Sequence, residues 1–432
     1  MPTLMQKIND HSAHVSVIGL GYVGLPLALG FAMAGYRVTG IDTDPGKVAD
    51  IQAGRSRVQD VCDADLQHAV TSGRFQATHD FTVLKDVDTV SICVPTPLNK
   101  TKDPDISYVV AAAEAIRTHL HPGQLIVLES TTYPGTTDEV LLPMFQTTGL
   151  QVGSDFFLAF SPERIDPGNT TFRLYNTPKI LGGVTAQCTQ AAATLYQQLI
   201  ATVVPMSSSR AAEMVKLLEN TFRAVNIGLV NEVALMCARL DLDVWEVIDA
   251  AATKPFGFMP FYPGPGLGGH CIPLDPHYLA WKLKTLDYRA RFIELADDIN
   301  ASMPHHVVTR IADVLNEVQK SIKGSKILLL GMAYKADTHD IRESPALEIL
   351  RLLHAKGSAV YFHDPFIAEV DISGARSTAL TAQILNWADC VVITTNHSVY
   401  DYPWIVEQAQ LIVDTRNATR HVKDGREKIY KL

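Results

Sequence analysis

The stretch HVSVIGLGYVGLPLALGFAMAGYRVTGID, residues 14–42, decides the fold of the first part of the chain. It begins as an apolar run that ends in glycine, continues with apolar residues at helical spacing, and closes with a second β-branched run. This succession predicts a strand, a helix and a second strand of one sheet. Three glycines, Gly19, Gly21 and Gly24, occupy the turn between the first strand and the helix in G-x-G-x-x-G spacing.

The glycine spacing predicts that this turn binds a dinucleotide. Glycines allow a tight turn and let a pyrophosphate approach the N-terminus of the helix. Asp42 ends the second strand, 18 residues after Gly24, where a carboxylate accepts hydrogen bonds from ribose hydroxyls and repels a 2′-phosphate. We therefore expect NAD rather than NADP, with Lys47 close enough to modify that preference. The alternative is a glycine turn that binds nothing.

Outward from this stretch, the alternation of strands and helices continues in two series. The first series predicts strands in DTVSICV, QLIVLES, FFLAFSP and PKILGG; the second begins near residue 325 and predicts them in SKILLLGMAY, SAVYFHDP, DCVVITTN and QLIVDTRN. Such alternation is typical of parallel sheets covered by helices on both faces. We expect two Rossmann-like, doubly wound α/β domains, over residues 1–206 and 303–432, joined by a long central helix.

That helix is predicted over residues 210–240, RAAEMVKLLENTFRAVNIGLVNEVALMCARL, which contain no proline. A single helix of this length runs about 45 Å. Its apolar sides predict packing against both domains or a second subunit, and a plain connector is the alternative. We assign residues 207–302 to a central helical region that also contains a cysteine-bearing loop.

Composition and charge exclude several classes of function. The chain has 432 residues, too many for one ordinary core, and a net charge of −9 without a basic run, so we expect neither nucleic acid nor a membrane surface as partner. No apolar run is long enough to span a membrane, and the first residues lack an apolar signal core. Six cysteines without a pairing pattern are typical of reduced thiols, so we expect a cytoplasmic protein.

The loop PFYPGPGLGGHCIPLDP, residues 260–276, is rich in proline and glycine and presents Cys271. Helices and central strands avoid this composition, so the loop is rigid and irregular. Asp275 lies four residues later and could act as a base or orient a water. A buried, inert cysteine is the alternative. We do not expect His270 to face the thiol, because adjacent residues rarely face each other, and without a second clustered ligand pair we expect no metal.

Two further pairs of polar residues lie on the predicted long helix and directly after a predicted strand. Lys216 and Asn220 are four residues apart on the long helix, so they share one face and supply a cation and an amide donor, the parts of an oxyanion site. Glu163 and Arg164 directly follow an apolar strand, at the carboxyl end of the first sheet.

Three cations are predicted at the carboxyl edge of the second sheet, Lys335, Arg342 and Arg416. Open α/β sheets bind ligands at that edge, and cations there suit a phosphate or diphosphate. The alternative is surface ion pairing with Asp337, Asp340 and Glu343.

Eight motifs occur in order from residue 19 to residue 417: GLGYVGLPLA, CVPTP, ESTTYPGTT, SPERIDPG, EMVKLLENTFRAVNIGLVNE, GGHCIPLDP, GMAYKADTHDIRESP and DTRN. On these motifs the chain resembles the UDP-glucose/GDP-mannose dehydrogenase family over nearly its whole length. The resemblance implies two Rossmann-like domains, the second binding a UDP-sugar, and a long helix that forms a homodimer. It also implies oxidation of the C6 alcohol of a nucleotide sugar to a carboxylate by two NAD in succession.

The resemblance also assigns roles to residues. It makes Cys271 the nucleophile, whose thiolate adds to an aldehyde to give a thiohemiacetal, then a thioester that water hydrolyses. The other catalytic residues are Lys216, Asn220, Asp275, Glu163 and Thr131. The cofactor contacts are Gly19, Gly21, Tyr22, Val23, Gly24, Asp42, Lys47, Thr96, Thr131 and Arg342. The substrate contacts are Glu163, Arg164, Lys216, Asn220, Tyr262, Gly268, Lys335 and Arg416.

Two departures from the glucose enzymes of the family bear on the substrate. Leu274 stands where those enzymes have lysine, and Arg164 stands where they have phenylalanine. Both changes are similar to the branch that acts on UDP-N-acetylhexosamines, so the expected substrate is UDP-N-acetylglucosamine, with Arg164 and Tyr262 as candidates to bind its acetamide. The alternatives are UDP-N-acetylmannosamine, UDP-N-acetylgalactosamine or UDP-glucose, a two-electron dehydrogenase or epimerase, and a binding module that holds NAD without turnover.

Overall fold

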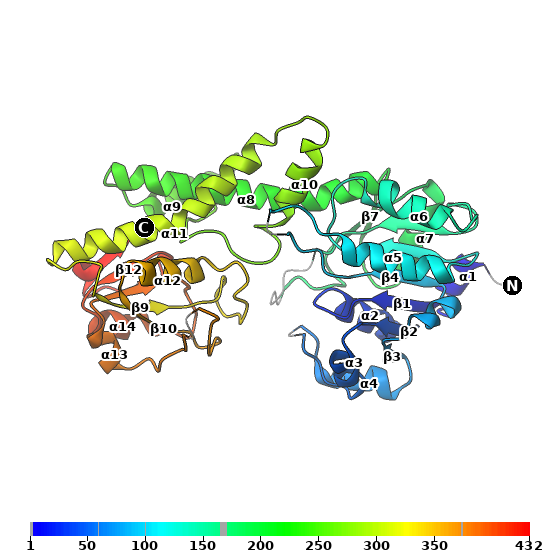
Figure 1. The fold of residues 1–432 in the computed structure, drawn as a ribbon, viewed down its shortest axis with the longest axis horizontal. Helices are drawn as coiled ribbons and strands as arrows, with labels where there is room; N and C mark the ends of the chain where they lie inside the picture. The colour runs from blue at the N-terminus through cyan, green and yellow to red at the C-terminus, as the bar shows by residue number, and fades with distance from the viewer. Residues whose placement is uncertain (1–2, 59, 100, 165–170, 373–374) are drawn as a thin grey trace. The chain divides into compact units, whose positions relative to one another are not determined.

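The computed structural model describes residues 3–58, 60–99, 101–164, 171–372 and 375–432. The chain divides into two compact units (Figure 1). The first unit contains Met1–Glu219 and His277–Tyr288, and the second contains Asn220–Pro276 and Arg289–Leu432.

Among the described residues, the first unit contains an eight-stranded sheet with the order β3-β2-β1-β4-β5-β6-β7-β8. Its strands are β1 (His14–Ile18), β2 (Arg37–Ile41), β3 (Phe75–Thr78), β4 (Thr89–Ile92), β5 (Leu125–Leu128), β6 (Phe157–Phe160), β7 (Lys179–Gly183) and β8 (Val203–Pro205). The first six strands are parallel in the order 3-2-1-4-5-6, which is that of dinucleotide-binding domains. β7 pairs with β6 in antiparallel direction, so the prediction of a parallel sheet fails at that one junction.

Helices cover both faces of this sheet. They are α1 (Leu4–Asn9), α2 (Gly24–Met33), α3 (Pro45–Gln52), α4 (Asp63–Thr71), α5 (Ser107–His119), α6 (Leu142–Gln146) and α7 (Ala186–Gln197), with the short helices η1 (Phe81–Asp86) and η2 (Thr136–Leu141). Val15 and Val17 of β1 pack on one face against Phe31 of α2. Ile18 of β1 packs on the opposite face with Ile116 of α5. This alternation follows from the two-residue period of a strand.

The predicted long helix is present as α8 (Ser209–Arg239), which has 31 residues and contains the border between the two units. A second helix, α10 (Asp275–Lys284), also contains a border, after Pro276. Gly228 is the one glycine of α8, and a Cβ there would lie 3.1 Å from the Cβ of Ala296. Glycine therefore permits the close packing of α8 on α11 (Arg291–Glu317) within the second unit.

In the part of the second unit that the structure describes, the strands form a five-stranded parallel sheet with the order β10-β9-β11-β12-β13. Its strands are β9 (Lys326–Leu330), β10 (Ala359–His363), β11 (Cys390–Ile393), β12 (Ile412–Asp414) and β13 (Ile429–Lys431). The helices not yet named are α9 (Val244–Ala252), α12 (Pro345–Ala355), α13 (Ala382–Trp387), α14 (Tyr402–Gln408) and the short η3 (Arg426–Lys428). The order 2-1-3-4-5 places the topological switch point between β9 and β11, where ligands bind at the carboxyl ends of the strands.

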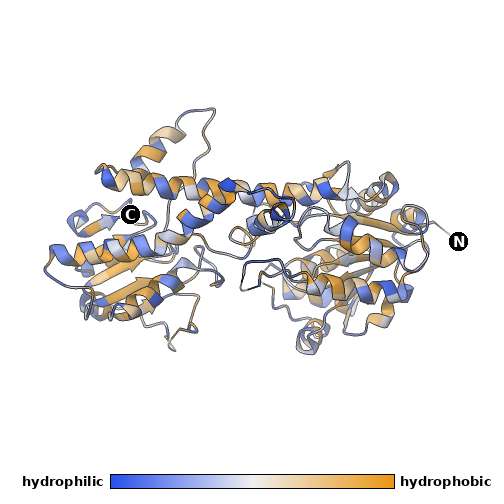
Figure 2. Cartoon of the chain, turned by 45° about the horizontal axis from the view of Figure 1, so that its top comes forward, coloured by the Kyte–Doolittle hydropathy of each residue, from blue (hydrophilic) through white to orange (hydrophobic). Residues whose placement is uncertain are grey.

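The second sheet is also covered on both faces. Leu329 packs with Ile349 of α12, whereas Leu330 packs with Leu385 of α13 on the other face. Figure 2 shows the strands of both sheets as predominantly hydrophobic, consistent with this burial. The two α/β domains and the central helix that the sequence predicts are therefore confirmed. Across the described part of the chain, no helix combines the length and apolar character needed to cross a membrane.

Candidate active site

The glycine turn of the first unit fits a dinucleotide. Gly19 has φ +92°, and a Cβ on Gly24 would lie 1.8 Å from the main-chain oxygen of Gly19, so both positions require glycine. A Cβ on Gly21 would meet no atom within 4 Å, which leaves the space beside the turn open. Tyr22 and Val23 complete the turn before α2 begins at Gly24. The turn lies beside β4, at the switch point of the sheet.

Asp42 lies at the carboxyl end of β2 and faces this turn. Its Oδ2 accepts hydrogen bonds from the Leu20 N–H at 2.9 Å and from Lys47 Nζ at 2.7 Å. Burial acts to raise the pKa of Asp42, but these bonds and one from the Asp44 N–H hold that pKa below its usual value. Asp44 also caps α3, which brings Lys47 round to Asp42. The carboxylate is thus ionised and oriented as an acceptor.

A cavity of about 190 Å³ lies beside the glycine turn. Gly21, Tyr22 and Lys47 are among its lining residues, together with Arg55 and Arg57. The structure therefore brings together several residues that the sequence assigns to cofactor binding.

The loops after β4 and β5 carry the predicted cofactor contacts Thr96 and Thr131. The hydroxyl of Ser130 donates to the main-chain oxygen of Val94 at 2.8 Å and so joins the two loops. Tyr278 of α10 donates to the main-chain oxygen of Thr96 at 2.8 Å. These bonds hold both loops at the edge of the sheet beside the glycine turn.

Glu213 of α8 holds the far end of the Thr131 loop. Its carboxylate accepts hydrogen bonds from the N–H groups of Gly135 and Thr137 and from the Thr137 hydroxyl, at 2.6, 2.9 and 2.7 Å. Burial raises the pKa of Glu213 to about 7, although these hydrogen bonds act to lower it. Glu213 was not among the predicted site residues.

A buried ion pair between Lys179 and Glu129, neither of which was a predicted site residue, lies next to these loops. Lys179 Nζ lies 2.7 Å from Glu129 Oε2, and both side chains are buried. Tyr196 donates to the other oxygen of Glu129, and Lys179 also donates to the main-chain oxygen of Pro162 at 3.4 Å. The pair therefore links the start of the Thr131 loop to the residue before Glu163. A charged residue directly after an apolar strand, as in QLIVLES, was the signal available in the sequence.

Glu163 and Lys216 meet directly in the first unit. The Lys216 ammonium group donates to the main-chain oxygen of Glu163 at 2.6 Å, and the Glu163 carboxylate accepts from the Arg164 N–H at 2.7 Å. Arg164 ion-pairs with Glu219 of α8 and donates to the main-chain oxygen of Pro178 at 2.6 Å. The rest of the SPERIDPG motif, residues 165–168, lies outside the described residues.

The cysteine loop belongs to the second unit, and its glycines allow close packing there. A Cβ on Gly264 would lie 2.6 Å from Arg416 Nη1, and one on Gly268 would lie 2.7 Å from Tyr334 Cβ. Gly269 has φ +95° and donates from its N–H to the main-chain oxygen of Arg342 at 3.0 Å. The loop therefore lies against the segments that carry the predicted substrate cations.

Cys271 is partly exposed, and its Sγ lies 3.3 Å from Nδ1 of His270. The expectation that this neighbour would not face the thiol is therefore wrong, because the irregular loop turns both side chains to one side. The main-chain oxygen of Cys271 accepts from the Asp275 N–H at 2.9 Å, where α10 begins. The Asp275 side chain accepts a hydrogen bond from the Asn220 amide, whose oxygen accepts from Arg223. Cys271, Asp275 and Asn220 are thus linked within the second unit.

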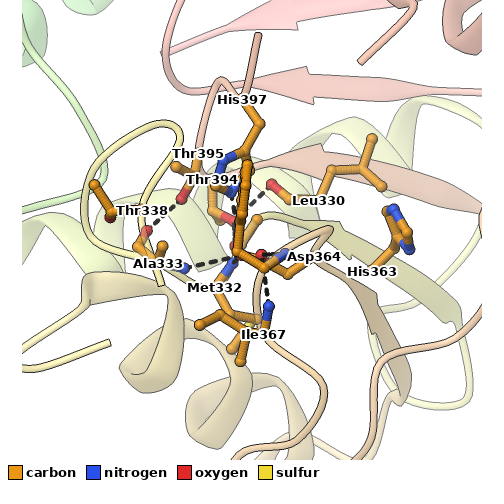
Figure 3. Close-up of polar contacts among 12 residues, drawn as sticks. Leu330, Met332, Ala333, Thr338, His363, Asp364, Ile367, Thr394, Thr395 and His397 are labelled. Atoms are coloured by element: carbon orange, nitrogen blue, oxygen red, sulfur yellow. Dashed lines mark hydrogen bonds and ion pairs between the residues drawn. The ribbon is translucent and has the colours of Figure 1, made fainter. Parts of the chain in front are cut away.

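The three predicted cations lie in segments that follow strands of the second sheet, Lys335 and Arg342 between β9 and α12, and Arg416 after β12. Arg342 forms an ion pair with Asp340 at 2.6 Å, which is one of the alternatives that the sequence left open. Arg416 donates from Nε to the main-chain oxygen of Thr394 at 3.1 Å, and burial lowers its pKa to about 10. The main-chain oxygen of Lys335 accepts from the Thr338 hydroxyl at 3.0 Å. Figure 3 shows the polar contacts around the switch point, including Thr338, Thr394 and Thr395.

Tyr262 is the last of the predicted substrate contacts. The Tyr262 ring stacks on Trp245 with 5.7 Å between centroids, and its hydroxyl donates to Asp249 at 2.8 Å. Within the described ranges, no group of three or more His, Cys, Asp and Glu side chains could hold a metal ion.

Comparison with known proteins matches all three parts of the chain to one family. The models of the UDP-glucose/GDP-mannose dehydrogenase family match as the NAD binding domain at residues 13–200, the central domain at 210–302 and the UDP binding domain at 328–421.

Similar proteins carry different substrate names. A UDP-N-acetyl-D-glucosamine 6-dehydrogenase of Pseudomonas aeruginosa is 34% identical over 83% of this chain and 84% of its own length. An NDP-N-acetyl-D-galactosaminuronic acid dehydrogenase of Ralstonia solanacearum is 35% identical over 93% and 95%. The solved structure of a UDP-D-ManNAc dehydrogenase from Pyrococcus horikoshii has a TM-score of 0.88 at 32% identity, covering 97% of this chain and 98% of that one.

Proposed function

Because the chain belongs to the UDP-glucose/GDP-mannose dehydrogenase family and is thus an NAD-dependent UDP-sugar dehydrogenase, we propose that it oxidises UDP-N-acetylglucosamine at C6 to UDP-N-acetylglucosaminuronate. The product would serve as a precursor of surface polysaccharide. Leu274 and Arg164 support an N-acetylhexosamine, since the glucose enzymes have lysine and phenylalanine at these positions. The epimers UDP-N-acetylmannosamine and UDP-N-acetylgalactosamine retain the acetamide and are the nearest alternatives.

The position of Cys271 is the observation that best supports a four-electron oxidation. Its loop packs closely against other segments of the second unit, its main-chain oxygen accepts a hydrogen bond at the start of α10, and His270 lies 3.3 Å from its sulfur. A rigidly held, partly exposed thiol can attack a carbonyl carbon at a fixed distance. Binding of NAD alone would not need such a group.

NAD, when bound, accepts a hydride from C6 in each of the two oxidations. Lys216 and Asn220 hold the C6 oxygen and stabilise its negative charge. The Cys271 thiolate forms a C–S bond to the aldehyde carbon, and the carbonyl oxygen takes a proton. The resulting thiohemiacetal loses its hydride and also its hydroxyl proton, which passes to water as the C6 hydroxyl proton does in the first oxidation, and so becomes a thioester. Water then attacks the thioester, Asp275 takes the proton, and the C–S bond breaks to give the carboxylate and the thiol.

The remaining predicted residues are assigned to the cofactor and to the substrate. We assign Asp42 and Lys47 to the ribose of NAD, Thr96 and Thr131 to the side of its nicotinamide, and Arg342 to a further cofactor contact. Lys335 and Arg416 bind the UDP moiety, and Glu163 and Gly268 border the sugar. Arg342 would exchange its Asp340 contact for the ligand.

The test is a panel of five nucleotide sugars with NAD: UDP-N-acetylglucosamine, its two epimers, UDP-glucose and GDP-mannose. We expect the highest kcat/KM for UDP-N-acetylglucosamine and two NADH for each sugar consumed. One NADH per sugar would indicate a two-electron dehydrogenase, and no NADH with any sugar would indicate a binding module. A best rate with UDP-glucose or GDP-mannose would overturn the substrate proposal, whereas a best rate with an epimer would correct only the stereochemistry.

We also propose that α8 forms a homodimer. Five large apolar side chains of this helix are exposed, with spacings of four or seven residues that place them along one stripe: Met214, Leu218, Phe222, Leu229 and Met236. A second copy of the same helix would bury such a stripe. Light scattering coupled to gel filtration should give twice the chain mass, and Leu229→Glu should reduce it to the mass of one chain. A monomeric wild type would contradict the proposal.

Two further assignments complete the proposal. We retain the division into residues 1–206, 207–302 and 303–432, with the UDP-sugar bound by the last. We also place the protein in the cytoplasm, because its six cysteines are all free, as expected in a reducing compartment.

A further inference from the structure

Each unit has an aspartate directly after its second strand, and the two aspartates make the same contact. Asp42 follows β2, and its Oδ2 accepts from the Leu20 N–H at 2.9 Å. Asp364 follows β10, and its Oδ2 accepts from the Met332 N–H at 2.6 Å. The residue before each donor is a glycine with a φ near +90°, +92° in the first unit and +93° in the second. Asp364 is therefore the counterpart, in the second unit, of the ribose-binding aspartate in the first.

The two aspartates differ in what covers them. The Asp364 side chain has no exposed surface, because Nε2 of His397 lies 3.1 Å from Oδ2 and the Ala333 N–H donates to the same oxygen at 3.1 Å. Figure 3 shows these side chains meeting between the ends of β9, β10 and β11. Burial acts to raise the pKa of Asp364, but the bonds from His397 and the neighbouring N–H groups hold it below its usual value. A ribose cannot reach this carboxylate.

His397 uses its second nitrogen to hold the loop that follows β9. Its Nδ1 accepts from the Asp337 N–H at 2.9 Å, while Nε2 faces the carboxylate, so the ring donates to Asp364 and accepts from the loop. Asp337 has φ +60°, and its Oδ1 accepts from the Ser398 N–H at 2.8 Å. The imidazole therefore bridges the end of β10 and the far end of residues 331–337.

This loop supports two parts of the active site. It contains Lys335, the cation assigned to UDP, and Tyr334, whose side chain packs on the cysteine loop. A Cβ on Gly268 would lie 2.7 Å from Tyr334 Cβ, and one on Gly269 would lie 2.8 Å from its ring. Those glycines come directly before His270 and Cys271 in the chain.

We propose that His397 is a positioning residue of the dehydrogenase, which together with Asp364 fixes residues 331–337 so that Lys335 meets the diphosphate and Tyr334 supports the loop of Cys271. In the second domain, the aspartate at the position that corresponds to Asp42 therefore does not bind a ribose but holds this loop from inside the domain. The inference rests on the proposed function for the roles of Lys335 and Cys271.

The test compares His397→Gln with His397→Asn in the full-length chain. The amide nitrogen of Gln can replace Nε2 but leaves the Asp337 N–H without its acceptor, whereas the amide oxygen of Asn can replace Nδ1. We expect His397→Gln to weaken the binding of UDP, measured by calorimetry, by about tenfold, the scale of one lost hydrogen bond. His397→Asn should recover part of that loss. The affinity for NAD should stay within about twofold of that of the wild type in both variants. A twofold change in affinity corresponds to only a few tenths of a kcal/mol.

The matched control is His14→Gln, which alters a buried histidine of β1 that bonds to Thr39 at 2.8 Å. General destabilisation would affect both proteins, but only His397→Gln should speed hydrogen exchange at the amides of residues 266–271. Wild-type UDP affinity and wild-type exchange in a folded His397→Gln protein would overturn the proposal.

If the His397→Gln protein does not fold, the Asp337→Gly variant tests the role of the loop instead. Glycine keeps the φ of +60° and the N–H but removes the side-chain bond to Ser398, so the loop gains freedom while the buried pair remains. We expect UDP to bind about threefold more weakly, and unchanged affinity would overturn the role of the loop contact. A wild type that does not bind UDP would overturn the proposed function itself, and the exchange comparison would still test the support of the cysteine loop.

Discussion

The Lys216 ammonium group donates a hydrogen bond to the main-chain oxygen of Glu163, with 2.6 Å between the two atoms. The lysine comes from α8 and the glutamate from the loop after β6, so this one bond joins two elements of the candidate site. Lys216 is only 9% exposed, which strengthens its interaction with any negative charge beside it.

Replacement of Lys216 by Ala should lower kcat by about 10²-fold or more, the scale of one lost oxyanion donor. In the proposed mechanism the variant loses the charge beside the C6 oxygen, and it also loses the bond to the Glu163 loop. Steady-state kinetics with the best UDP-sugar measures the effect. Lys7→Ala, which removes a lysine paired with Asp88 elsewhere in the first unit, should keep wild-type kcat. A small effect of Lys216→Ala, matching that of Lys7→Ala, would remove Lys216 from the catalytic set.

Replacement of Cys271 by Ser should abolish release of the uronate, because a serine hydroxyl is scarcely ionised and far less nucleophilic than a thiolate. In the proposed mechanism the first oxidation does not need the thiol, so rapid mixing should still detect NADH formed in the first turnover. The exposed Cys62 provides the control, since Cys62→Ser should yield two NADH per sugar as in the wild type. The covalent scheme would not survive near-native uronate production by Cys271→Ser.

The main architecture could be predicted because its signals are local. Glycine spacing, apolar runs and turn residues fix β1, α2 and β2, and the absence of proline fixes α8. The missed strands are short: β3 has four residues and lies at the edge of its sheet, and β8 and β13 have three each. Short edge strands carry little periodicity and depend on the neighbour that they pair with. The antiparallel direction of β7 likewise comes from tertiary pairing.

Sequence patterns select the candidate site residues, but they do not predict the contacts between those residues. Asp42 and Glu163 were candidates because each lies at the end of a predicted strand or directly after it. Lys216 and Asn220 were candidates because their spacing places them on one face of a helix. The bond between Asn220 and Asp275 joins residues 55 positions apart, which no local pattern encodes. Asp364 had a usable signal, because it follows a strand in the same way as Asp42, and the SAVYFHDP run shows that position in the sequence.

Replacement of Asp42 by Ala should raise the KM for NAD by about tenfold, since it removes a charged acceptor for the ribose hydroxyls. It also releases Lys47, which lies 2.7 Å from the Asp42 carboxylate and would then be available to a 2′-phosphate. The ratio of kcat/KM for NAD to that for NADP should therefore fall. Kinetics with both cofactors measures this ratio, and Asp42→Asn, which keeps an acceptor oxygen, should show the smaller loss for NAD. An unchanged ratio in Asp42→Ala would contradict the role of Asp42 in cofactor choice.

Glu213 should make the stability of the first unit depend on pH. Its pKa is about 7 in the fold and 4.5 ordinarily, so the folded protein binds more protons than the unfolded chain between those values. The stabilising contribution of this group is therefore complete below pH 4.5 and is lost as the pH rises through about 7.

Glu213→Gln lacks this titration, so the melting temperature of the wild type relative to the variant should fall by several degrees between about pH 5 and about pH 8. Thermal unfolding followed by circular dichroism gives the difference at each pH. Glu114→Gln, at an exposed carboxylate of α5 paired with Arg117, should leave the pH profile of the wild type intact. A wild-type profile parallel to that of Glu213→Gln would show that Glu213 keeps one protonation state throughout.

Arg164 has two possible roles that kinetics can separate. Its guanidinium braces α8 through Glu219 and the loop before β7 through the main-chain oxygen of Pro178. If Arg164 also binds the acetamide, Arg164→Ala should lower kcat/KM for UDP-N-acetylglucosamine about tenfold more than for UDP-glucose, because only the first sugar loses a hydrogen-bond partner. Glu219→Gln, which leaves the guanidinium but weakens the brace, should lower both values equally. Equal losses for the two sugars in Arg164→Ala would assign Arg164 to the brace alone, and recognition of the acetamide would then pass to Tyr262, whose replacement by Phe tests it in the same assay.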